Sequence, residues 1–295
     1  MRAFAHDVYT YPLPEGHRFP LGKYRLVREG AETSPGIDVH EARAATTAEL
    51  GHAHAGDYIA RVERGRLSRR EELALGLPWS PALVERARRS VGATLLAVDA
   101  ALADGIGANL GGGTHHAFPD SGRGFCVFND VVAAARTLRA AGRVGRVLVV
   151  DLDVHQGDGT HAAFLDEPEV FTFGVNGFAN YPFRRVPGDL EADLPDGAGD
   201  DPYLDAVRRL LPQAVARARP ELCFYLAGAD PYEGDRLGRL AVTKDGLAAR
   251  DRLVRETLSR AGVPVCLTLA GGYADPIDDT VEINLTTLRE FASPS

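Results

Sequence analysis

The amino-acid sequence predicts an α/β fold, a single three-layer domain in which helices flank a central, mostly parallel β-sheet. Short apolar runs bounded by turn-forming residues alternate along the chain with longer amphipathic segments. The runs are continuously apolar, which is typical of strands that are covered on both faces. Strands that alternate with helices indicate parallel pairing, with helices on both sides of the sheet.

Four apolar runs and four amphipathic segments carry this prediction. The strands are predicted at residues 146–151, 170–175, 222–227 and 265–269. The helices are predicted from residue 80 to about 105, from about 129 to 142, from 201 onward and from 243 to 262. Ser80, Asn129 and Thr243 are residue types that cap helix N-termini, and Gly105 and Gly262 are typical of helix C-termini.

Composition indicates one globular domain over residues 1–295. The 295 residues are 45% hydrophobic and 25% charged, which is enough apolar material for a full core, and no linker, repeat or low-complexity tract divides the chain. Three cysteines, Cys126, Cys223 and Cys266, are far apart and form no CxxC pair. A disulfide framework and a cysteine-based zinc site are therefore not expected.

The charge balance bears on partners and location. The formal net charge of −8 predicts no nucleic-acid binding and no attraction to an anionic membrane, and it favours a cationic partner. No apolar run approaches the roughly 20 residues that cross a bilayer, and the first residues lack the apolar core of a signal peptide. We therefore expect a cytoplasmic protein that does not enter a membrane.

Polar clusters follow the predicted strands. They are Gly-Gly-Gly-Thr-His-His at 111–116, Asp-Leu-Asp-Val-His at 151–155, Ala-Gly-Ala-Asp at 227–230 and Gly-Gly-Tyr at 271–273. In open parallel sheets, ligands bind at the carboxyl ends of the strands. We therefore expect all four clusters to meet at one edge of the sheet and to form a site there.

The cluster at 151–155 predicts a metal centre. In an extended segment Asp151, Asp153 and His155 point to the same side, so that Asp153 and His155 can bind one divalent ion. Asp230, at the end of another strand, is the best placed third ligand. Oxygen and nitrogen donors without sulfur are typical of catalytic zinc, which keeps a fourth position open for water. The alternative is that Asp153 and His155 only cap the turn at 156–159.

Acid, base and hydrogen-bond donor groups are also present at this edge. His115 and His116 are predicted to transfer protons, one to deprotonate the metal-activated water and one to protonate the leaving amine. Nearby carboxylates such as Asp151 and Asp158 would fix their tautomers. Tyr273 is placed to donate a hydrogen bond to the developing oxyanion. Ordinary loop hydrogen bonding and side-chain packing are the alternatives.

At these residues the chain resembles the zinc-dependent histone deacetylase family, especially its class IV branch and the bacterial relatives of that branch. The similarity extends from Leu-Pro-Glu-Gly-His-Arg-Phe-Pro at 13–20 to about Leu288. Its motifs, in family order, are Gly-Gly-Thr-His-His-Ala at 112–117, Gly-Phe-Cys-Val-Phe-Asn-Asp at 124–130, Asp-Leu-Asp-Val-His-Gln-Gly-Asp-Gly-Thr at 151–160, Ala-Gly-Ala-Asp at 227–230 with Glu-Gly-Asp-Arg-Leu-Gly at 233–238, and Gly-Gly-Tyr at 271–273.

The resemblance implies an arginase-like α/β fold and a hydrolase that removes acyl groups from lysine. It implies one Zn²⁺ per chain on Asp153, His155 and Asp230. It makes His115 and His116 the acid/base pair, oriented by Asp151 and Asp158 respectively, and Tyr273 the group that polarises the carbonyl. It also implies a tunnel for the acyl-lysine stem, lined by Phe125 with Tyr181 and Leu237 as neighbours.

Two segments depart from the family pattern. Gly174 and Asn176 stand where relatives usually carry serine and histidine, and that serine helps to bind a monovalent cation beside Asp151. A K⁺ site here would depend on Asp151 and backbone carbonyl groups. The segment 76–80 also lacks the rim aspartate that many relatives use to hold the substrate backbone, so that weak discrimination among peptide sequences is expected.

Several functional readings remain open. Acylated lysine in a protein or peptide is the expected partner, and a small acylated amine such as an acetylated polyamine is an alternative. Removal of long fatty acyl groups is another alternative, as is a module that binds acyl-lysine without cleaving it. A two-manganese ureohydrolase is disfavoured, because Gly228 stands where its additional aspartate is needed. The sequence does not define the oligomeric state.

Overall fold

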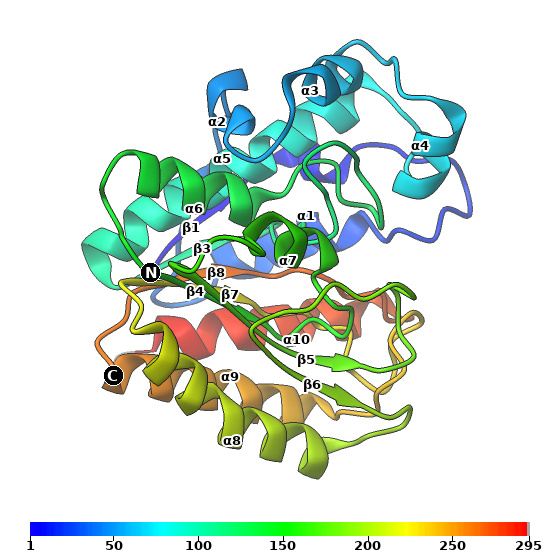
Figure 1. Ribbon diagram of the computed structural model, residues 1–295. Coiled ribbons are helices and arrows are strands. Elements are labelled where there is room, and N and C mark those ends of the chain that lie inside the picture. Colours follow the sequence, from blue (N-terminus) through cyan, green and yellow to red (C-terminus); the bar gives the residue numbers. More distant parts are fainter. Residues whose placement is uncertain (294–295) are drawn as a thin grey trace.

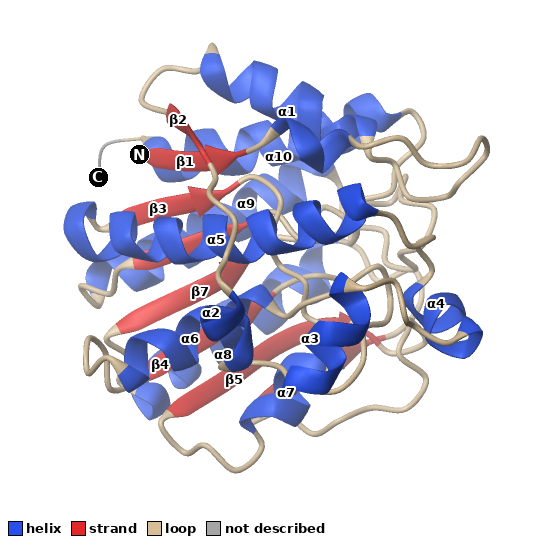
Figure 2. Cartoon of the chain, turned by 90° about the horizontal axis from the view of Figure 1, so that it is seen from above, coloured by secondary structure: helices blue, strands red, loops and turns tan. Residues whose placement is uncertain are grey.

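The computed structural model describes residues 1–293 and shows one eight-stranded sheet in which every pair of neighbouring strands is parallel. The strand order is β2-β1-β3-β8-β7-β4-β5-β6 (Figures 1 and 2). The strands are β1 Arg2–Ala5, β2 Asp38–Glu41, β3 Ile106–Asn109, β4 Val147–Asp151, β5 Val170–Gly177, β6 Leu190–Leu194, β7 Leu222–Leu226 and β8 Val265–Thr268.

Helices cover both faces of the sheet. In Figure 1, α8, α9 and α10 lie below it, while α5, α6 and α7 lie above it. The helices are α1 Gly22–Glu32, α2 Thr47–Gly51, α3 Gly56–Glu63, α4 Arg69–Leu75, α5 Pro81–Asp104, α6 Asp130–Ala140, α7 Asp158–Phe164, α8 Asp200–Ala218, α9 Lys244–Arg260 and α10 Ile277–Ala292, with a short 3₁₀ turn at Asp7–Thr10. Two buried apolar clusters, one on each face of the sheet, form the core.

The predicted fold class is confirmed, and the predicted elements are central ones. The four predicted strands are β4, β5, β7 and β8, and their observed ends lie within two residues of the predicted ones. The predicted helices are α5, α6, α8 and α9, and the side chains of Ser80, Asn129 and Thr243 accept the expected capping hydrogen bonds from backbone N–H groups. The single-domain organisation stays a prediction.

The other strands carry weaker signals in the sequence, for physical reasons. Strands β2 and β6 lie at the two edges of the sheet, where β2 is largely exposed and β6 is mostly half-buried, so they carry polar residues instead of an apolar run. Strands β1 and β3 are short and lack a continuous apolar run, because Arg2 begins β1 and Asn109 ends β3. Within residues 1–293, every helix is too short or too polar to cross a membrane.

Close packing of α5 on β3 fixes the start of the loop at 111–116. Gly107 in β3 lies so near α5 that a Cβ atom there would be 2.1 Å from the carbonyl oxygen of Ala97 and 2.8 Å from the Cβ atom of Ala100. A side chain of any size would therefore push the helix away from the sheet, four residues before the predicted site begins.

We expect Gly107→Ala to lower the free energy of unfolding by roughly 1–3 kcal/mol, because the added methyl group has no room against the backbone of α5. Gly51→Ala is the matched control, since a Cβ atom at Gly51 would meet nothing within 4 Å. Thermal unfolding of the two variants and the parent protein checks this. Equal melting temperatures for both variants would show that α5 can shift without loss of stability.

Candidate active site

Asp153, His155 and Asp230 come together at the carboxyl ends of two neighbouring strands. Asp153 and His155 follow β4, and Asp230 follows β7. One ligand atom from each of the three side chains lies within 4.8 Å of the others. Nδ1 of His155 is 2.9 Å from Oδ1 of Asp153 and 3.2 Å from Oδ2 of Asp230. The three side chains are thus arranged around one point.

Backbone N–H groups orient the carboxylates of Asp153 and Asp230. The N–H of Gly271 donates to Oδ2 of Asp153 at 2.8 Å, and the N–H of Val154 donates to Oδ1 of Asp230 at 2.9 Å. Gly271 must be glycine, because a Cβ atom there would lie 1.9 Å from Oδ2 of Asp230. At Gly228 a Cβ atom would lie 2.8 Å from Oδ1 of Asp230. Both glycines leave room for the carboxylates.

The electrostatics of this trio suit a divalent cation. Burial and the neighbouring charge of Asp153 raise the pKa of Asp230 to about 7. Burial would lower the pKa of His155, but hydrogen bonds and charges of the two carboxylates raise it to about 10. Two buried carboxylates beside one imidazole leave an excess of negative charge that a 2+ ion would neutralise. The donor set, two oxygens and one nitrogen without sulfur, fits a catalytic zinc ion.

The two adjacent histidines each contact a different carboxylate. Nδ1 of His115 donates to Oδ2 of Asp151 at 2.7 Å, and Nδ1 of His116 donates to Oδ1 of Asp158 at 2.7 Å. All four side chains are buried. Because Nδ1 of each ring is engaged, Nε2 of each is the atom that remains for proton transfer.

The environments of the two histidines separate their pKa values. Burial alone would lower the pKa of His115, but the charges of Asp151 and Asp153 outweigh burial and raise the pKa to about 9. Burial lowers the pKa of His116 to about 4, with a further contribution from the charge of His115. The two neighbouring imidazoles thus have opposite pKa shifts, which separates their roles in proton transfer.

Tyr273 is held at the site through its backbone. Its N–H donates to Oδ2 of Asp235 at 2.6 Å, while Oδ1 of Asp235 accepts from the N–H groups of Leu237 and Gly238 at 2.8 and 2.9 Å. Burial and the charge of Asp230 raise the pKa of the Tyr273 phenol well above its ordinary value, so the hydroxyl group stays protonated and can donate. Asp235 belongs to the motif at 233–238, but the sequence alone indicates no role for it.

Lys23 is another residue that the sequence analysis missed. It belongs to α1 and is only 2% exposed. Its Nζ donates to the carbonyl oxygen of Gly272 at 3.1 Å and lies 5.3 Å from the centre of the Tyr273 ring. A lysine on the apolar face of an amphipathic helix is the only sign of this contact in the sequence, and it does not name the partner.

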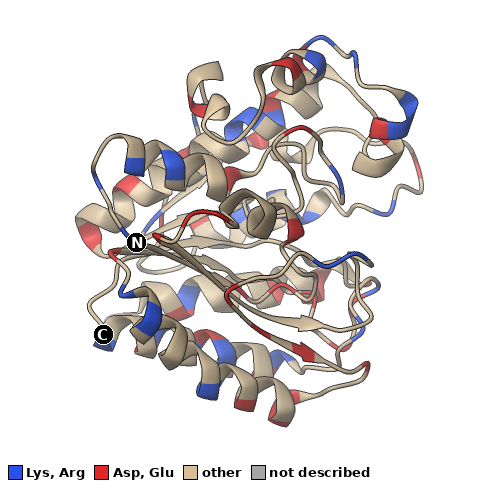
Figure 3. Cartoon of the chain, in the orientation of Figure 1, with Lys and Arg blue, Asp and Glu red and all other residues tan. Residues whose placement is uncertain are grey.

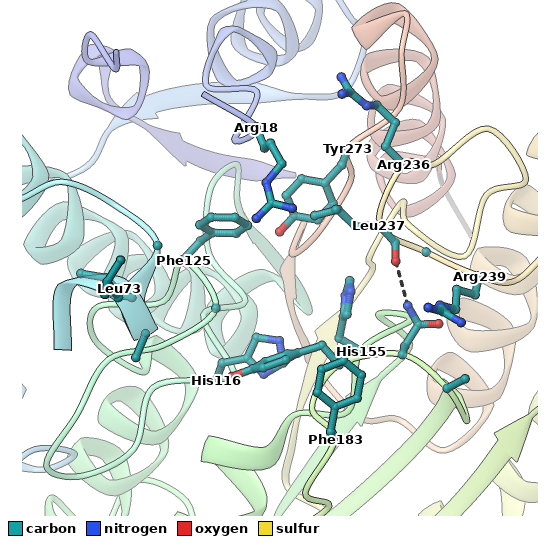
Figure 4. A pocket seen from close by; sticks show the side chains of 18 residues that line it. Arg18, Leu73, His116, Phe125, His155, Phe183, Arg236, Leu237, Arg239 and Tyr273 are labelled. Carbon is teal, nitrogen blue, oxygen red and sulfur yellow. Dashed lines mark hydrogen bonds between the residues drawn. The ribbon is translucent and has the colours of Figure 1, made fainter. Parts of the chain in front are cut away.

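A cavity of about 580 Å³ leads to these groups (Figure 4). His116, His155 and Tyr273 line it, and the predicted tunnel residues Phe125, Tyr181 and Leu237 line it as well. Phe125 adopts a φ of +66°, a left-handed conformation that a bulky side chain rarely takes, and its ring lies 6.0 Å from that of Tyr273. The exposed side chains Leu73 and Phe183 lie at its mouth.

A second, much smaller cavity of about 30 Å³ lies on the inner side of the same groups. His115, Asp153 and Tyr273 border it together with the three glycines at 111–113. Arg86 borders it too and is 3% exposed. Nη2 of Arg86 donates to the hydroxyl of Tyr24 at 2.9 Å, Nε has no partner, and no carboxylate of residues 1–293 lies within 4.0 Å of the guanidinium.

The residues beside Asp151 do not fit a potassium site of the family type. Gly174 supplies no hydroxyl group, and both carboxylate oxygens of Asp151 already accept hydrogen bonds, from His115 and from the N–H of Asp153. Nδ2 of Asn176 points at the carbonyl oxygens of Asp153 and His155, at 3.3 and 3.5 Å. In this orientation the N–H₂ group of Asn176 meets the carbonyl groups to which a cation would bind, and its Oδ1 has no hydrogen-bond partner among residues 1–293.

Known proteins match this chain over most of its length. Residues 17–287 match the histone deacetylase domain family. An uncharacterized protein of Picosynechococcus is 43% identical over 280 residues, which cover 94% of this chain and 93% of that protein. The histone deacetylase-like amidohydrolase of Pseudomonas aeruginosa is 30% identical over 254 residues, which cover 81% of this chain and 67% of that protein. The solved structure of an HDAC homolog from Aquifex aeolicus matches with a TM-score of 0.84 at 23% identity, over 99% of this chain and 84% of that one.

The contacts of Asn176 predict that K⁺ does not affect the protein. We expect exchange of K⁺ for Na⁺ or choline at constant ionic strength to change kcat/KM and the melting temperature little, less than about twofold in rate. The comparison variant is Gly174→Ser combined with Asn176→His, which restores the residues usual in the family and should gain a response to K⁺. A saturable activation of the parent protein by K⁺ would mean that the amide is reversed, with Oδ1 of Asn176 bound to a cation.

Proposed function

Because the chain belongs to the histone deacetylase family, we propose that it is a zinc-dependent amidohydrolase that removes an acetyl group from a lysine-type amine. One observation carries this proposal. Asp153, His155, His115, His116 and Tyr273 all border the inner cavity, Asp230 lies beside Asp153 and His155, and Asp151 and Asp158 contact the two histidines. Together these groups supply every element of amide hydrolysis.

The metal ligands set the position of the reacting carbonyl. A zinc ion held by Asp153, His155 and Asp230 would polarise the acyl carbonyl group and lower the pKa of a water molecule. The protonated Tyr273 hydroxyl donates a hydrogen bond to the oxygen of that carbonyl as negative charge develops on it. In this arrangement the chain recognises the transition state more strongly than the planar amide.

The positions of the two histidines in the cavities determine which of them transfers protons. His116 borders the outer cavity, through which the amine leaves, whereas His115 borders only the inner one. Nε2 of His116 is therefore the atom that accepts a proton from the attacking water and returns it to the leaving nitrogen. His115, paired with Asp151, borders the inner cavity and would assist electrostatically from there. Asp158 keeps the His116 ring in the orientation that presents Nε2.

The walls of the outer cavity fit the aliphatic part of a lysine side chain. Phe125, Tyr181 and Leu237 offer apolar surface to the cavity. An apolar stem that fills this passage removes water from around the amide and strengthens the hydrogen bonds made to it. The amine side of the substrate then extends to the mouth.

The inner cavity favours a short acyl group. Its volume of about 30 Å³ suits a methyl group but not a long alkyl chain. The buried guanidinium of Arg86 also borders this space, and an alkyl chain in contact with it would desolvate a charge without pairing it. We therefore favour acetyl over fatty acyl groups.

Replacement of Tyr273 tests the proposed hydrogen bond to the carbonyl. Tyr273→Phe should reduce kcat on an acetyl-lysine amide by about 10²–10³-fold and leave the zinc content unchanged, because the phenol acts on the transition state and is not a ligand. Tyr232→Phe is the control, since its hydroxyl contacts Asp279 outside the cavity. Near-parental turnover by the Tyr273→Phe protein would eliminate the role given to this residue.

A series of acyl chains tests the inner cavity. On one peptide that carries acetyl, butyryl, octanoyl or myristoyl lysine, we expect kcat/KM to fall as the chain lengthens, with acetyl at least about tenfold above octanoyl. Acetylspermidine is measured alongside to test the polyamine alternative. Faster removal of myristoyl than of acetyl would contradict the preference. A zinc-loaded protein that is inert toward all these compounds would instead be a binding module.

A further inference from the structure

Apart from the histidines of the site, all charged side chains that line the outer cavity are arginines. They are Arg18, Arg236 and Arg239, and no aspartate or glutamate of residues 1–293 belongs to the lining. Over the whole chain, by contrast, 41 acidic residues outnumber 33 basic ones. Figure 3 shows acidic and basic residues mixed along the helices. The mouth of the cavity thus has a positive field that the net charge of the protein conceals.

Arg18 is the arginine with unused binding capacity. Its side chain is exposed, and its guanidinium makes no hydrogen bond or ion pair with any residue of the described chain. Figure 4 shows it extending into the cavity between Phe125 and Tyr273. With Arg236, Leu237 and Tyr273 it also encloses a recess of about 110 Å³ at the mouth.

The segment that carries Arg18 is fixed on both sides. The ring of His17 contacts the carbonyl oxygen of Gly76 through Nε2 at 3.0 Å and accepts the N–H of Phe19 on Nδ1 at 3.1 Å. Phe19 is buried, with its ring 4.9 Å from that of Phe125. The backbone at Arg18 is therefore held beside the entrance, so that binding of a ligand by the guanidinium orders the side chain alone.

The other two arginines are partly compensated. Arg236 lies 3.5 Å from Asp275, and Arg239 lies 3.1 Å from Asp196. Both pairs are exposed to solvent, where an ion pair contributes little and exchanges partners readily. Arg236 can therefore turn toward a negatively charged group in the recess that it shares with Arg18.

We propose that the substrate carries a carboxylate on its amine side, bound at the mouth by Arg18 with support from Arg236. This inference rests on the proposed function, which places the acyl group at the inner end and the lysine stem along the walls. The backbone end of the lysine then reaches the arginines, and a guanidinium binds a carboxylate through two parallel hydrogen bonds. A polyamine would bring further positive charge to the same place and is disfavoured.

Two sources can supply this carboxylate. One is the α-carboxylate of free or C-terminal Nε-acetyl-lysine, and the other is an acidic side chain next to acetyl-lysine within a peptide. The segment 76–80 offers no aspartate to bind a peptide backbone, as the sequence analysis noted. Binding of a substrate carboxylate by Arg18 would take the place of hydrogen bonds to the peptide backbone of the substrate.

The test compares substrates that differ only in charge. The series is Nα-acetyl-Nε-acetyl-lysine as the free acid and as the carboxamide, an internal acetyl-lysine peptide flanked by glutamate or by glutamine, and acetylspermidine. We expect an anionic member to exceed its neutral partner about tenfold in kcat/KM, mainly through KM, and the advantage to shrink as salt is raised. A preference for the free acid points to the α-carboxylate, and a preference for the glutamate peptide points to an acidic side chain.

Variants assign the effect to Arg18. In Arg18→Gln the ratio between anionic and neutral partners should fall to about one, and in Arg18→Glu it should invert. Arg208→Gln removes the same charge from an exposed position on α8, outside the cavity, and should keep the parental ratio. Melting temperatures show whether each variant is folded.

The outcomes separate the two proposals. Turnover of the neutral amides at rates equal to their anionic partners, or a ratio that Arg18→Gln leaves unchanged, would overturn the carboxylate inference and leave the amidohydrolase proposal standing. No turnover of any member by zinc-loaded protein would overturn the amidohydrolase proposal itself.

Discussion

The approach of two buried carboxylates, Asp153 and Asp230, is the constraint on which the rest of the site depends. Two negative charges that lie close together in a buried site repel each other strongly. The backbone N–H groups, the imidazole of His155 and a bound cation offset that repulsion. Arg250 of α9, which is fully buried, holds the backbone beside both of these carboxylates. It donates to the carbonyl oxygens of Leu152 and Gly228, so that it ties together the two segments that carry the carboxylates.

The sequence was sufficient for the parts of the site that follow from local geometry. The rule that parallel strands end at one edge brought the motifs after β4, β7 and β8 together, and the spacing within 151–155 singled out Asp153 and His155. The roles of Lys23, Asp235 and Arg86 could not be found in this way. Each depends on contacts with residues far away in sequence, and a lone charged residue on a helix or loop looks the same in the sequence whether it faces solvent or a buried carbonyl group.

Net charge was the least informative quantity. A value of −8 averages over the whole surface, whereas a substrate responds to the few groups within about one Debye length of its binding site. The sequence placed Arg18 in a rim loop but gave no sign that its side chain would turn into the cavity. That orientation follows from Phe19, which is buried against Phe125 and leaves its neighbour facing the entrance.

A single turn, residues 270–273, links the metal ligands to the phenol. The N–H of Gly271 orients Asp153, the carbonyl group of Gly272 accepts from Lys23, and the N–H of Tyr273 donates to Asp235. Positive φ values at Ala270 (48°) and Gly272 (145°) bend the chain so that successive backbone groups point to different partners. A displacement of this turn would move the carboxylate and the phenol together. The glycines therefore fix the position of the catalytic groups relative to one another, and they also leave room for the carboxylates.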